Sequence, residues 1–205
     1  MTNRQIIDWL LEGDPSIKWQ VLRDLQNKEE ITYNKERQRV ITFGWGADLL
    51  SRQDNNGLWN GELYNGKWIS TTYTLYLLKI FGLPPGNEQA LKACNQLFIQ
   101  GLYEDQEIRF SRNQKNQDLG LSGFMLSILC YFGYRTEKIH NIAAYLIEKQ
   151  CKEGNWLPNE NSSALNYTFE TTLIILEGFL QYQKTYPSQK SKINDYVLKG
   201  QNFLS

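Results

Sequence analysis

Two carboxylates lie near the starts of apolar segments, where an acidic group could transfer a proton. Asp118 precedes the most apolar run of the chain, and Glu170 precedes a Thr-Thr pair that opens another apolar run. A carboxyl group held among aromatic side chains can act as a proton donor. The same positions also suit capping of a helix N-terminus and pairing with its dipole. Asp118 and Glu170 are therefore candidate catalytic acids, with helix capping as the competing interpretation.

Aromatic and hydroxyl side chains near these helix starts could contact a ligand. Helix N-termini offer N–H groups to a diphosphate or a carboxylate, and aromatic faces line hydrophobic cavities and stabilise carbocations. The candidate ligand-binding residues are Glu62, Tyr64, Trp68, Thr72, Tyr73, Phe124 and Tyr167. Packing in the core, or packing of a loop over the helix ends, is the competing interpretation.

A glutamine, a glycine and a tryptophan recur with the spacing Q-x-x-x-G-x-W. The two copies consist of Gln53, Gly57, Trp59, Gln150, Gly154 and Trp156. The glutamine amide can satisfy backbone groups at a helix end, the glycine permits a turn, and the indole packs over the amide. We therefore expect these six residues to stabilise a repeated structure.

Neither a metal site nor a cofactor site is predicted. The acidic run Glu104, Asp105 and Glu107 resembles a metal-binding loop only loosely, and a solvated loop is the simpler interpretation. The one histidine, His140, lies in a predicted outer helix, as a surface or partly buried residue. A catalytic zinc site normally takes three protein ligands, so we expect no bound metal.

Composition argues against several classes of partner. Lys and Arg number 22, as do Asp and Glu, so no net field favours nucleic acid. The apolar segment 119–134 would rise roughly 24 Å as a helix, short of a hydrocarbon core of ~30 Å. Asp8 interrupts the short apolar run near the N-terminus, so no signal peptide is expected. Three cysteines, Cys94, Cys130 and Cys151, fit neither a disulfide framework nor paired metal ligands, which favours a reducing cytoplasm.

Helical periodicity accounts for most of the chain, and no stretch predicts a strand. Helices are predicted over residues 3–12, 16–27, 35–53, 71–82, 87–100, 118–133, 136–150, 168–186 and 189–204. The helix at 35–53 is expected to bury Val40, Ile41, Trp45, Leu49 and Leu50. Gly44 and Gly46 would lie inside this helix and suggest a close approach to another helix.

The spacing of the helices predicts an all-α fold. More apolar helices begin near residues 71, 121 and 171, each followed by a more polar one, which is a repeat of about 50 residues. We expect a single α/α toroid-like domain, 1–205, with about four helical hairpins in two layers. Its parts are N-terminal helices at 1–30, repeats at about 31–83, 84–134 and 135–186, and a final helix at 187–205. A closed toroid takes about six hairpins, so we expect a partial barrel or arc, whose apolar surface a homo-oligomer would cover.

The chain resembles a known family. The Q-x-x-x-G-x-W motif is similar to the QW motif of squalene and oxidosqualene cyclases. The runs GDPSIKWQVLRDL (13–25) and GWGADLLSRQDNNGLWNGELYNGKWISTTYTL (44–75) resemble bacterial squalene-cyclase-like proteins of the prenyltransferase and squalene oxidase repeat family. The resemblance covers essentially the whole chain, although family members usually continue beyond the helix at 189–204.

The resemblance implies an α/α toroid that binds an isoprenoid or another hydrophobic ligand. The D-x-D-D, D-C-T-A and D-D-x-x-D clusters of terpene cyclases are absent, and the Asp-x-Cys of prenyltransferases is replaced by Asp118-Leu119-Gly120. Cyclase activity is therefore not expected from motifs alone. The alternative is a non-catalytic helical-repeat scaffold for protein–protein interaction or self-assembly. A sugar-active toroid, with two carboxyl groups about 5–10 Å apart, is a third interpretation.

Overall fold

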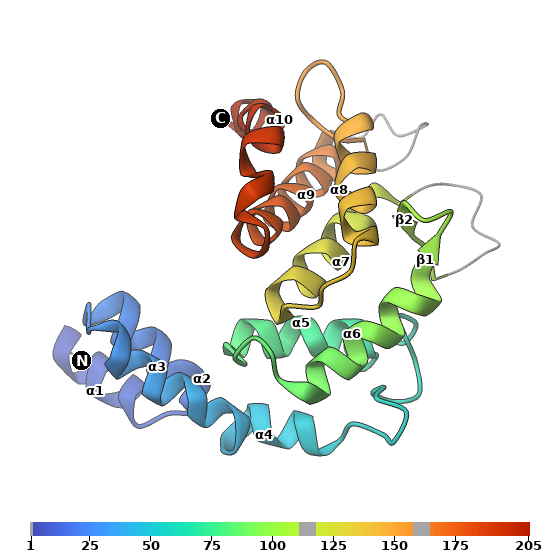
Figure 1. Ribbon diagram of the computed structural model, residues 1–205. Coiled ribbons are helices and arrows are strands. Elements are labelled where there is room, and N and C mark those ends of the chain that lie inside the picture. The colour runs from blue at the N-terminus through green and yellow to red at the C-terminus, as the bar shows by residue number, and fades with distance from the viewer. Residues whose placement is uncertain (1, 111–117, 158–164) are drawn as a thin grey trace. The chain divides into compact units, whose positions relative to one another are not determined.

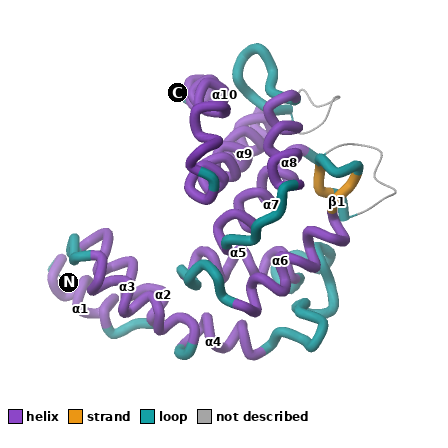
Figure 2. Tube along the Cα trace, in the orientation of Figure 1, coloured by secondary structure: helices purple, strands orange, loops and turns teal. Residues whose placement is uncertain are grey.

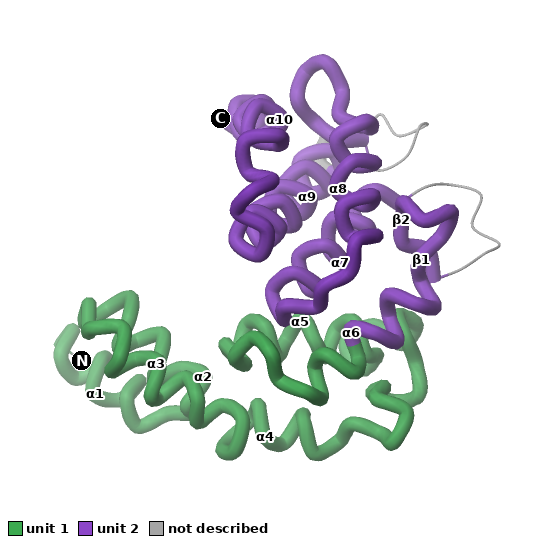
Figure 3. Tube along the Cα trace, viewed as in Figure 1, with its two compact units in different colours: residues 1–93 green, residues 94–205 purple. Residues whose placement is uncertain are grey.

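The computed structural model describes residues 2–110, 118–157 and 165–205. Helices make up 68% of the structure and strands 3%, so the predicted all-α class is confirmed (Figures 1 and 2). The chain divides into two compact units, residues 1–93 and 94–205, coloured separately in Figure 3. Each unit is described by itself.

The first unit consists of short helices followed by a long loop and a more apolar helix. Its elements are α1 (Asn3–Leu11), α2 (Pro15–Gln20), a π-helical turn (Val21–Leu25), α3 (Glu30–Gln38), a 3₁₀ turn (Arg39–Ile41), α4 (Gly44–Ser51), α5 (Thr71–Phe81) and the first residues of α6 (Glu88–Gly101). The helix α5 ends, as its sequence predicts, at Gly82, which adopts the left-handed conformation.

The predicted helix at 35–53 is wrong, because the chain breaks after α3. Gly44 has φ +70°, and a Cβ atom there would lie 1.9 Å from a carboxylate oxygen of Asp14. That carboxylate accepts the N–H groups of Ser16 and Trp45, both at 2.8 Å, and so caps the starts of α2 and α4 together. In consequence Trp45 is exposed rather than inward, whereas Val40 and Leu50 are buried as expected.

The second unit contains the other long helices and one small hairpin. Its elements are the remainder of α6, β1 (Leu102–Tyr103), β2 (Glu107–Ile108), α7 (Leu119–Phe132), α8 (Lys138–Glu148), α9 (Leu165–Thr185), a 3₁₀ turn (Pro187–Gln189) and α10 (Lys190–Leu204). The hairpin corrects the expectation of no strand. Its turn residues Glu104 and Asp105 both have positive φ, as a tight two-residue turn requires.

The helices α7 and α9 pack against each other through glycines (Figure 1). A Cβ atom on Gly178 would lie 2.6 Å from the carbonyl oxygen of Gly123, so only hydrogen at these positions permits the close backbone contact. Nearly all of α7 is buried, in line with its uniformly apolar sequence. By contrast, α10 buries only Ile193 and Gly200, which is typical of a helix with one apolar face.

Candidate functional site

The first Q-x-x-x-G-x-W copy forms a compact hydrogen-bonded loop. The side-chain amide of Gln53 donates to the carbonyls of Gly57 at 3.0 Å and Gln89 at 2.9 Å. The indole N–H of Trp59 donates to the carbonyl of Leu49 at 2.7 Å. The glutamine therefore links its own loop to α6, the second helix after the loop, while the indole donates to a carbonyl near the end of the preceding helix, α4.

The second copy repeats these contacts, and the bonds to the motif glycine and from the indole span the same number of residues in both copies. Gln150 donates to the carbonyls of Gly154 and Tyr196, both at 2.8 Å, and Trp156 donates to the carbonyl of Leu146 at 2.6 Å. In both copies the indole reaches the residue four positions before the glutamine. The tryptophan backbone N–H donates to a threonine hydroxyl on the following apolar helix, Thr71 in one copy and Thr172 in the other.

A third copy of the loop lies between these two and has lost all three motif residues. The backbone N–H of Ile108 donates to the Ser122 hydroxyl at 3.1 Å, the same contact that each tryptophan makes with its threonine. Counted along the chain, Leu102, Gln106 and Ile108 occupy the Gln, Gly and Trp positions. Leu121-Ser122-Gly123 resembles the Thr-Thr segments that begin the other apolar runs. Counting back from this segment could have located the third loop from the sequence.

The third loop is joined to α8, the second helix after it, by a hydrogen bond to a carboxylate instead of one from a glutamine amide. Glu107 is buried and forms an ion pair with Arg109, and the Tyr145 hydroxyl on α8 donates to the Glu107 carboxylate at 3.2 Å. Burial, and then the Glu107 carboxylate, raise the pKa of Tyr145. The guanidinium of Arg109 lies 4.2 Å from the Tyr103 ring centroid. The expectation of a solvated loop is wrong for Glu107, because Arg109 and Tyr145 cover it.

Three of the predicted ligand-binding residues come together where the loop before α5 meets the first turn of that helix. The rings of Tyr64 and Tyr73 stack at 5.6 Å between centroids, and Trp68 lies 5.4 Å from Tyr73. The Lys67 ammonium is 5.4 Å from the Trp68 ring. Trp68 is 69% exposed and has φ +79°, which is rare for a bulky side chain. The structure thus holds an exposed tryptophan on a cluster of tyrosine rings.

Hydroxyl groups at the start of α5 fasten this loop. The Thr71 and Thr72 side chains donate to the carbonyls of Glu62 at 2.7 Å and Leu63 at 2.8 Å, and their backbone N–H groups donate to the same two carbonyls. Both threonines are buried. The hydroxyl of Thr72 therefore acts within the protein, while Glu62 is exposed on the loop.

The remaining candidates lie on α7 and α9. Asp118 is the N-cap of α7 and accepts the Leu121 N–H at 2.9 Å. Glu170 and Tyr167 are exposed near the start of α9, and Phe124 is half-buried in α7. The structure brings together Tyr64, Trp68 and Tyr73 but describes no contact between the two candidate acids.

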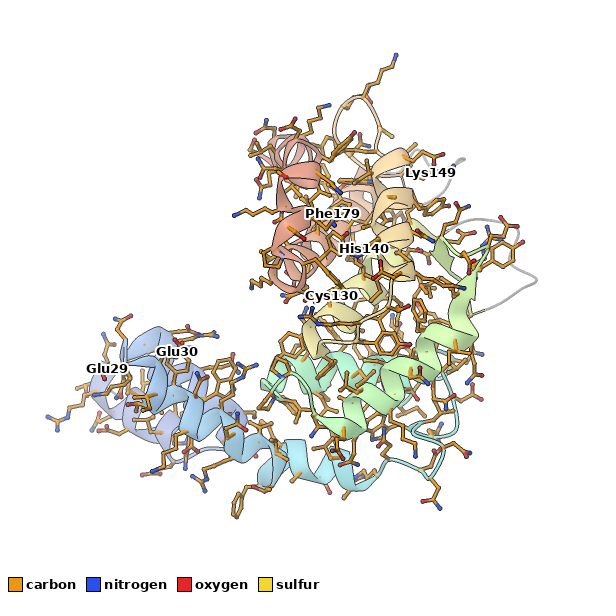
Figure 4. The ribbon with its side chains drawn as sticks, viewed as in Figure 1. Glu29, Glu30, Cys130, His140, Lys149 and Phe179 are labelled. Atoms are coloured by element: carbon orange, nitrogen blue, oxygen red, sulfur yellow. The ribbon has the colours of Figure 1, made fainter. Side chains whose placement is uncertain are left out.

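His140 belongs to a cluster with two tyrosines that the sequence does not reveal. His140 lies on α8 and is labelled in Figure 4. Its Nδ1 lies 2.6 Å from the Tyr182 hydroxyl, and its ring contacts Tyr186 edge-on. Burial raises the pKa of Tyr182 to about 12, so the phenol is protonated at neutral pH. Burial also raises the pKa of the nearby Cys130 thiol to about 12, which leaves it a poor nucleophile.

Comparison of the chain with protein-family models, with curated proteins and with solved structures gives no match. Within residues 2–110, 118–157 and 165–205, no group of three His, Cys, Asp or Glu side chains could hold a metal ion. None of the helices in those ranges combines the length and apolar character needed to cross a bilayer.

Proposed function

We propose that the chain is a squalene-cyclase-like α/α toroid, or an arc of one, that binds an isoprenoid or another hydrophobic ligand. The three repeated loops support this proposal. Each loop precedes a predominantly apolar helix, and in each the backbone N–H of the seventh position donates to a hydroxyl group on that helix. A regular array of such units is what the two-layer helical repeat requires.

One observation carries the ligand-binding proposal: Trp68 is exposed on a fastened loop with an unfavourable backbone conformation. A bulky residue at positive φ costs on the order of 1–3 kcal/mol, and such costs cluster at functional sites. Tyr73 contacts both Trp68 and Tyr64, so three aromatic rings gather here. Branched hydrocarbon chains pack favourably on such surfaces, because burial of apolar area is favourable and non-directional.

The test is a binding titration with a long-chain isoprenoid alcohol, in which binding is monitored through the intrinsic tryptophan fluorescence. We expect saturable binding that Trp68→Ala weakens about tenfold or more, since a buried tryptophan anchor contributes at least ~1.4 kcal/mol. Trp9→Ala is the matched control, because Trp9 is also exposed but lies on α1. Equal affinity of the two variants, or no saturation, would contradict the proposal.

Proton donation by Asp118 or Glu170 is a separate proposal about turnover. It predicts that Asp118→Asn or Glu170→Gln abolishes formation of any cyclised product while binding persists. Unchanged product in both variants would remove the two residues from that role.

A second candidate function is a non-catalytic repeat scaffold. The observation that favours it is the row of exposed apolar side chains on α9, which includes Leu173 and Leu180. A native mass spectrum distinguishes the two functions, because a retained lipid-sized adduct supports ligand binding and a ligand-free oligomer supports the scaffold.

A further inference from the structure

The segment between α4 and α5 carries three asparagine–glycine pairs. They are Asn56-Gly57, Asn60-Gly61 and Asn65-Gly66. An asparagine before a glycine readily loses its side-chain amide, because the next backbone nitrogen can attack the side-chain carbonyl carbon and glycine has no Cβ to hinder the approach. All three asparagines are exposed, so the local backbone decides which of them reacts.

The first pair is restrained by a hydrogen bond on the nitrogen that would attack. The Gly57 N–H donates to the Asp54 carbonyl at 2.9 Å. Gly57 is buried, and a Cβ atom there would lie 2.7 Å from Cγ of Lys92. The Asn56 N–H is also bound, to the Asp54 carboxylate at 2.8 Å. Attack at Asn56 therefore requires this turn to open first.

The second pair forms the centre of a tight turn. The Glu62 N–H donates to the Trp59 carbonyl at 3.2 Å. Asn60 and Gly61 have φ +56° and +65°, as in a type I′ turn. To bring the Gly61 nitrogen against the Asn60 side chain, the peptide group between them must turn over. The product of that rotation is a type II′ turn, whose first central residue is glycine, so the rotation is unfavourable for asparagine.

The third pair has neither restraint. Asn65 lies outside the left-handed region, and Gly66 is exposed with φ +74°. Within the described segments, neither the Asn65 carbonyl nor the Gly66 N–H forms a hydrogen bond. The peptide group that joins them can therefore turn about its flanking Cα atoms without breaking a bond. Of the three pairs, this one best allows the glycine nitrogen to reach the asparagine side chain.

Ser70 holds the chain on both sides of this peptide group. Its hydroxyl donates to the Tyr64 carbonyl at 3.0 Å, and its N–H donates to the Gly66 carbonyl at 3.1 Å. Ser70 is fully buried and is the N-cap residue of α5. The segment 64–66 thus spans the distance between two bonds to the same residue. An extra main-chain atom between Tyr64 and Gly66 would not fit that span with both bonds intact.

We propose that Asn65 is the site at which this chain deamidates spontaneously, and that the isoaspartyl product releases the loop from Ser70. The Gly66 nitrogen, on losing its proton, attacks the side-chain carbonyl carbon of Asn65. A new carbon–nitrogen bond forms, the side-chain amide bond breaks, and the amide nitrogen leaves as ammonia. Water then opens the succinimide at either carbonyl, which gives an aspartyl or an isoaspartyl residue with a new carboxylate. The isoaspartyl form has an extra methylene in the main chain.

The release affects the aromatic cluster on this loop. Tyr64 stacks on Tyr73, and Trp68 lies between the two residues whose backbone groups pair, Gly66 and Ser70. Loss of either Ser70 bond therefore frees one side of the cluster. The modification itself does not depend on the ligand proposed for this cluster, whereas its effect on that ligand rests on the proposed function.

Peptide mapping of the whole folded chain after incubation in mildly alkaline buffer tests the choice of site. All three asparagines lie in the tryptic peptide 53–67, and fragment masses locate the exchange of an NH₂ group for an OH group. Deamidation at Asn65 should be about tenfold faster or more than at Asn56, because Asn56 must first lose a hydrogen bond. In urea the three rates should agree within about threefold, since the folded turns are lost. Equal rates in the folded chain, or faster reaction at Asn56 or Asn60, would overturn the proposal.

Amide hydrogen exchange at Ser70 tests the release of the loop. The isoaspartyl protein is separated by ion exchange through its new carboxylate, and its Ser70 N–H should exchange about tenfold faster or more than in the unmodified chain. Asn65→Asp is the matched control, because it adds the charge without the methylene and should retain slow exchange. Asn65→Gln closes a larger ring much more slowly, so it should retain slow exchange after the same incubation.

Unchanged exchange in the isoaspartyl protein, or an equal increase in Asn65→Asp, would overturn the release from Ser70. Neither measurement uses a ligand. Failure of the isoprenoid titration would therefore leave both results unaffected, and the two proposals remain distinguishable.

Discussion

The side-chain amide of Gln150 donates to the backbone carbonyl of Tyr196 at 2.8 Å, which joins the second motif loop to α10. Gln53 makes the equivalent bond to the carbonyl of Gln89 in α6 at 2.9 Å. Both amides also close their own loops on the motif glycine. Each motif glutamine thus joins its loop to the second helix after that loop. Gln53 reaches α6, which follows α5, and Gln150 reaches α10, which follows α9.

Replacing Gln150 with leucine should lower the free energy of unfolding by about 2–3 kcal/mol. The substitution leaves the carbonyl of the buried Gly154 without its side-chain donor and removes the bond to Tyr196, and an unsatisfied buried group costs ~1–3 kcal/mol. Urea denaturation measures the loss. Gln201→Leu, at an exposed position of α10, is the control and should change stability by less than ~0.5 kcal/mol. Equal losses would mean that the bridge contributes nothing.

Gly154→Ala should be far more destabilising than Gly133→Ala. Both glycines have positive φ, at +95° and +78°, so the backbone strain is shared. Only at Gly154 would the new Cβ collide with backbone, at 2.4 Å from the Lys199 carbonyl oxygen, whereas Gly133 faces open space. We expect about 1 kcal/mol for Gly133→Ala and at least ~2 kcal/mol more for Gly154→Ala, measured by thermal or urea unfolding. Similar losses would refute the close contact of loop and α10.

Glu107→Gln should destabilise the second unit by about 3 kcal/mol, because it removes the buried carboxylate and leaves the partly buried Arg109 charge without a counter-ion. The matched control is Asp105→Asn, which breaks the exposed pair between Asp105 and Lys138. Exposed pairs contribute ~0–1 kcal/mol, and asparagine tolerates the positive φ of this turn. Urea unfolding, monitored by circular dichroism, measures the loss of stability in each of the two variants. A loss below ~1 kcal/mol for Glu107→Gln would show that the cluster is not buried in solution.

The stability of the chain should fall at alkaline pH partly because of Tyr182. Its pKa is raised to about 12 in the folded state by burial, whereas an unfolded tyrosine ionises near ~10. A raised pKa means that the unfolded state releases its proton first, so stability is intact below pH ~10 and is lost as the pH rises toward ~12. Tyr182→Phe should therefore reduce the fall in unfolding free energy across this window.

Tyr33→Phe serves as the control for the pH series, since Tyr33 is a partly exposed tyrosine of α3. It should leave the alkaline fall unchanged. If Tyr182→Phe follows the wild-type profile as closely as Tyr33→Phe does, the Tyr182 hydroxyl is not protected by burial.

Local patterns predicted several helices well. The helix expected at 71–82 is α5, Thr71–Phe81, and that expected at 118–133 is α7, Leu119–Phe132. Both end at glycines in the left-handed conformation, Gly82 and Gly133. These signals are reliable because helical periodicity and glycine termination depend on neighbours within a few residues.

Other features escaped the sequence because they lack a local pattern. Each strand of the hairpin has only two residues, too few for alternation to be seen. The break at Gly44 depends on a carboxylate thirty positions earlier in the chain, that of Asp14, which accepts the Trp45 N–H. The periodic apolar residues therefore predicted one long helix at 35–53, where the structure has the two shorter helices α3 and α4.

The sequence by itself determined the all-α class, most helix positions and the two intact motif loops, since these follow from spacing, capping and turn residues. Only the tertiary structure decided which distant groups meet. It paired Glu107 with Tyr145, placed His140 against Tyr182 and covered one side of α9 with α7 while leaving the other exposed. The physical reason is that such contacts depend on which helix faces pack together, and packing is a property of the whole unit rather than of any one segment.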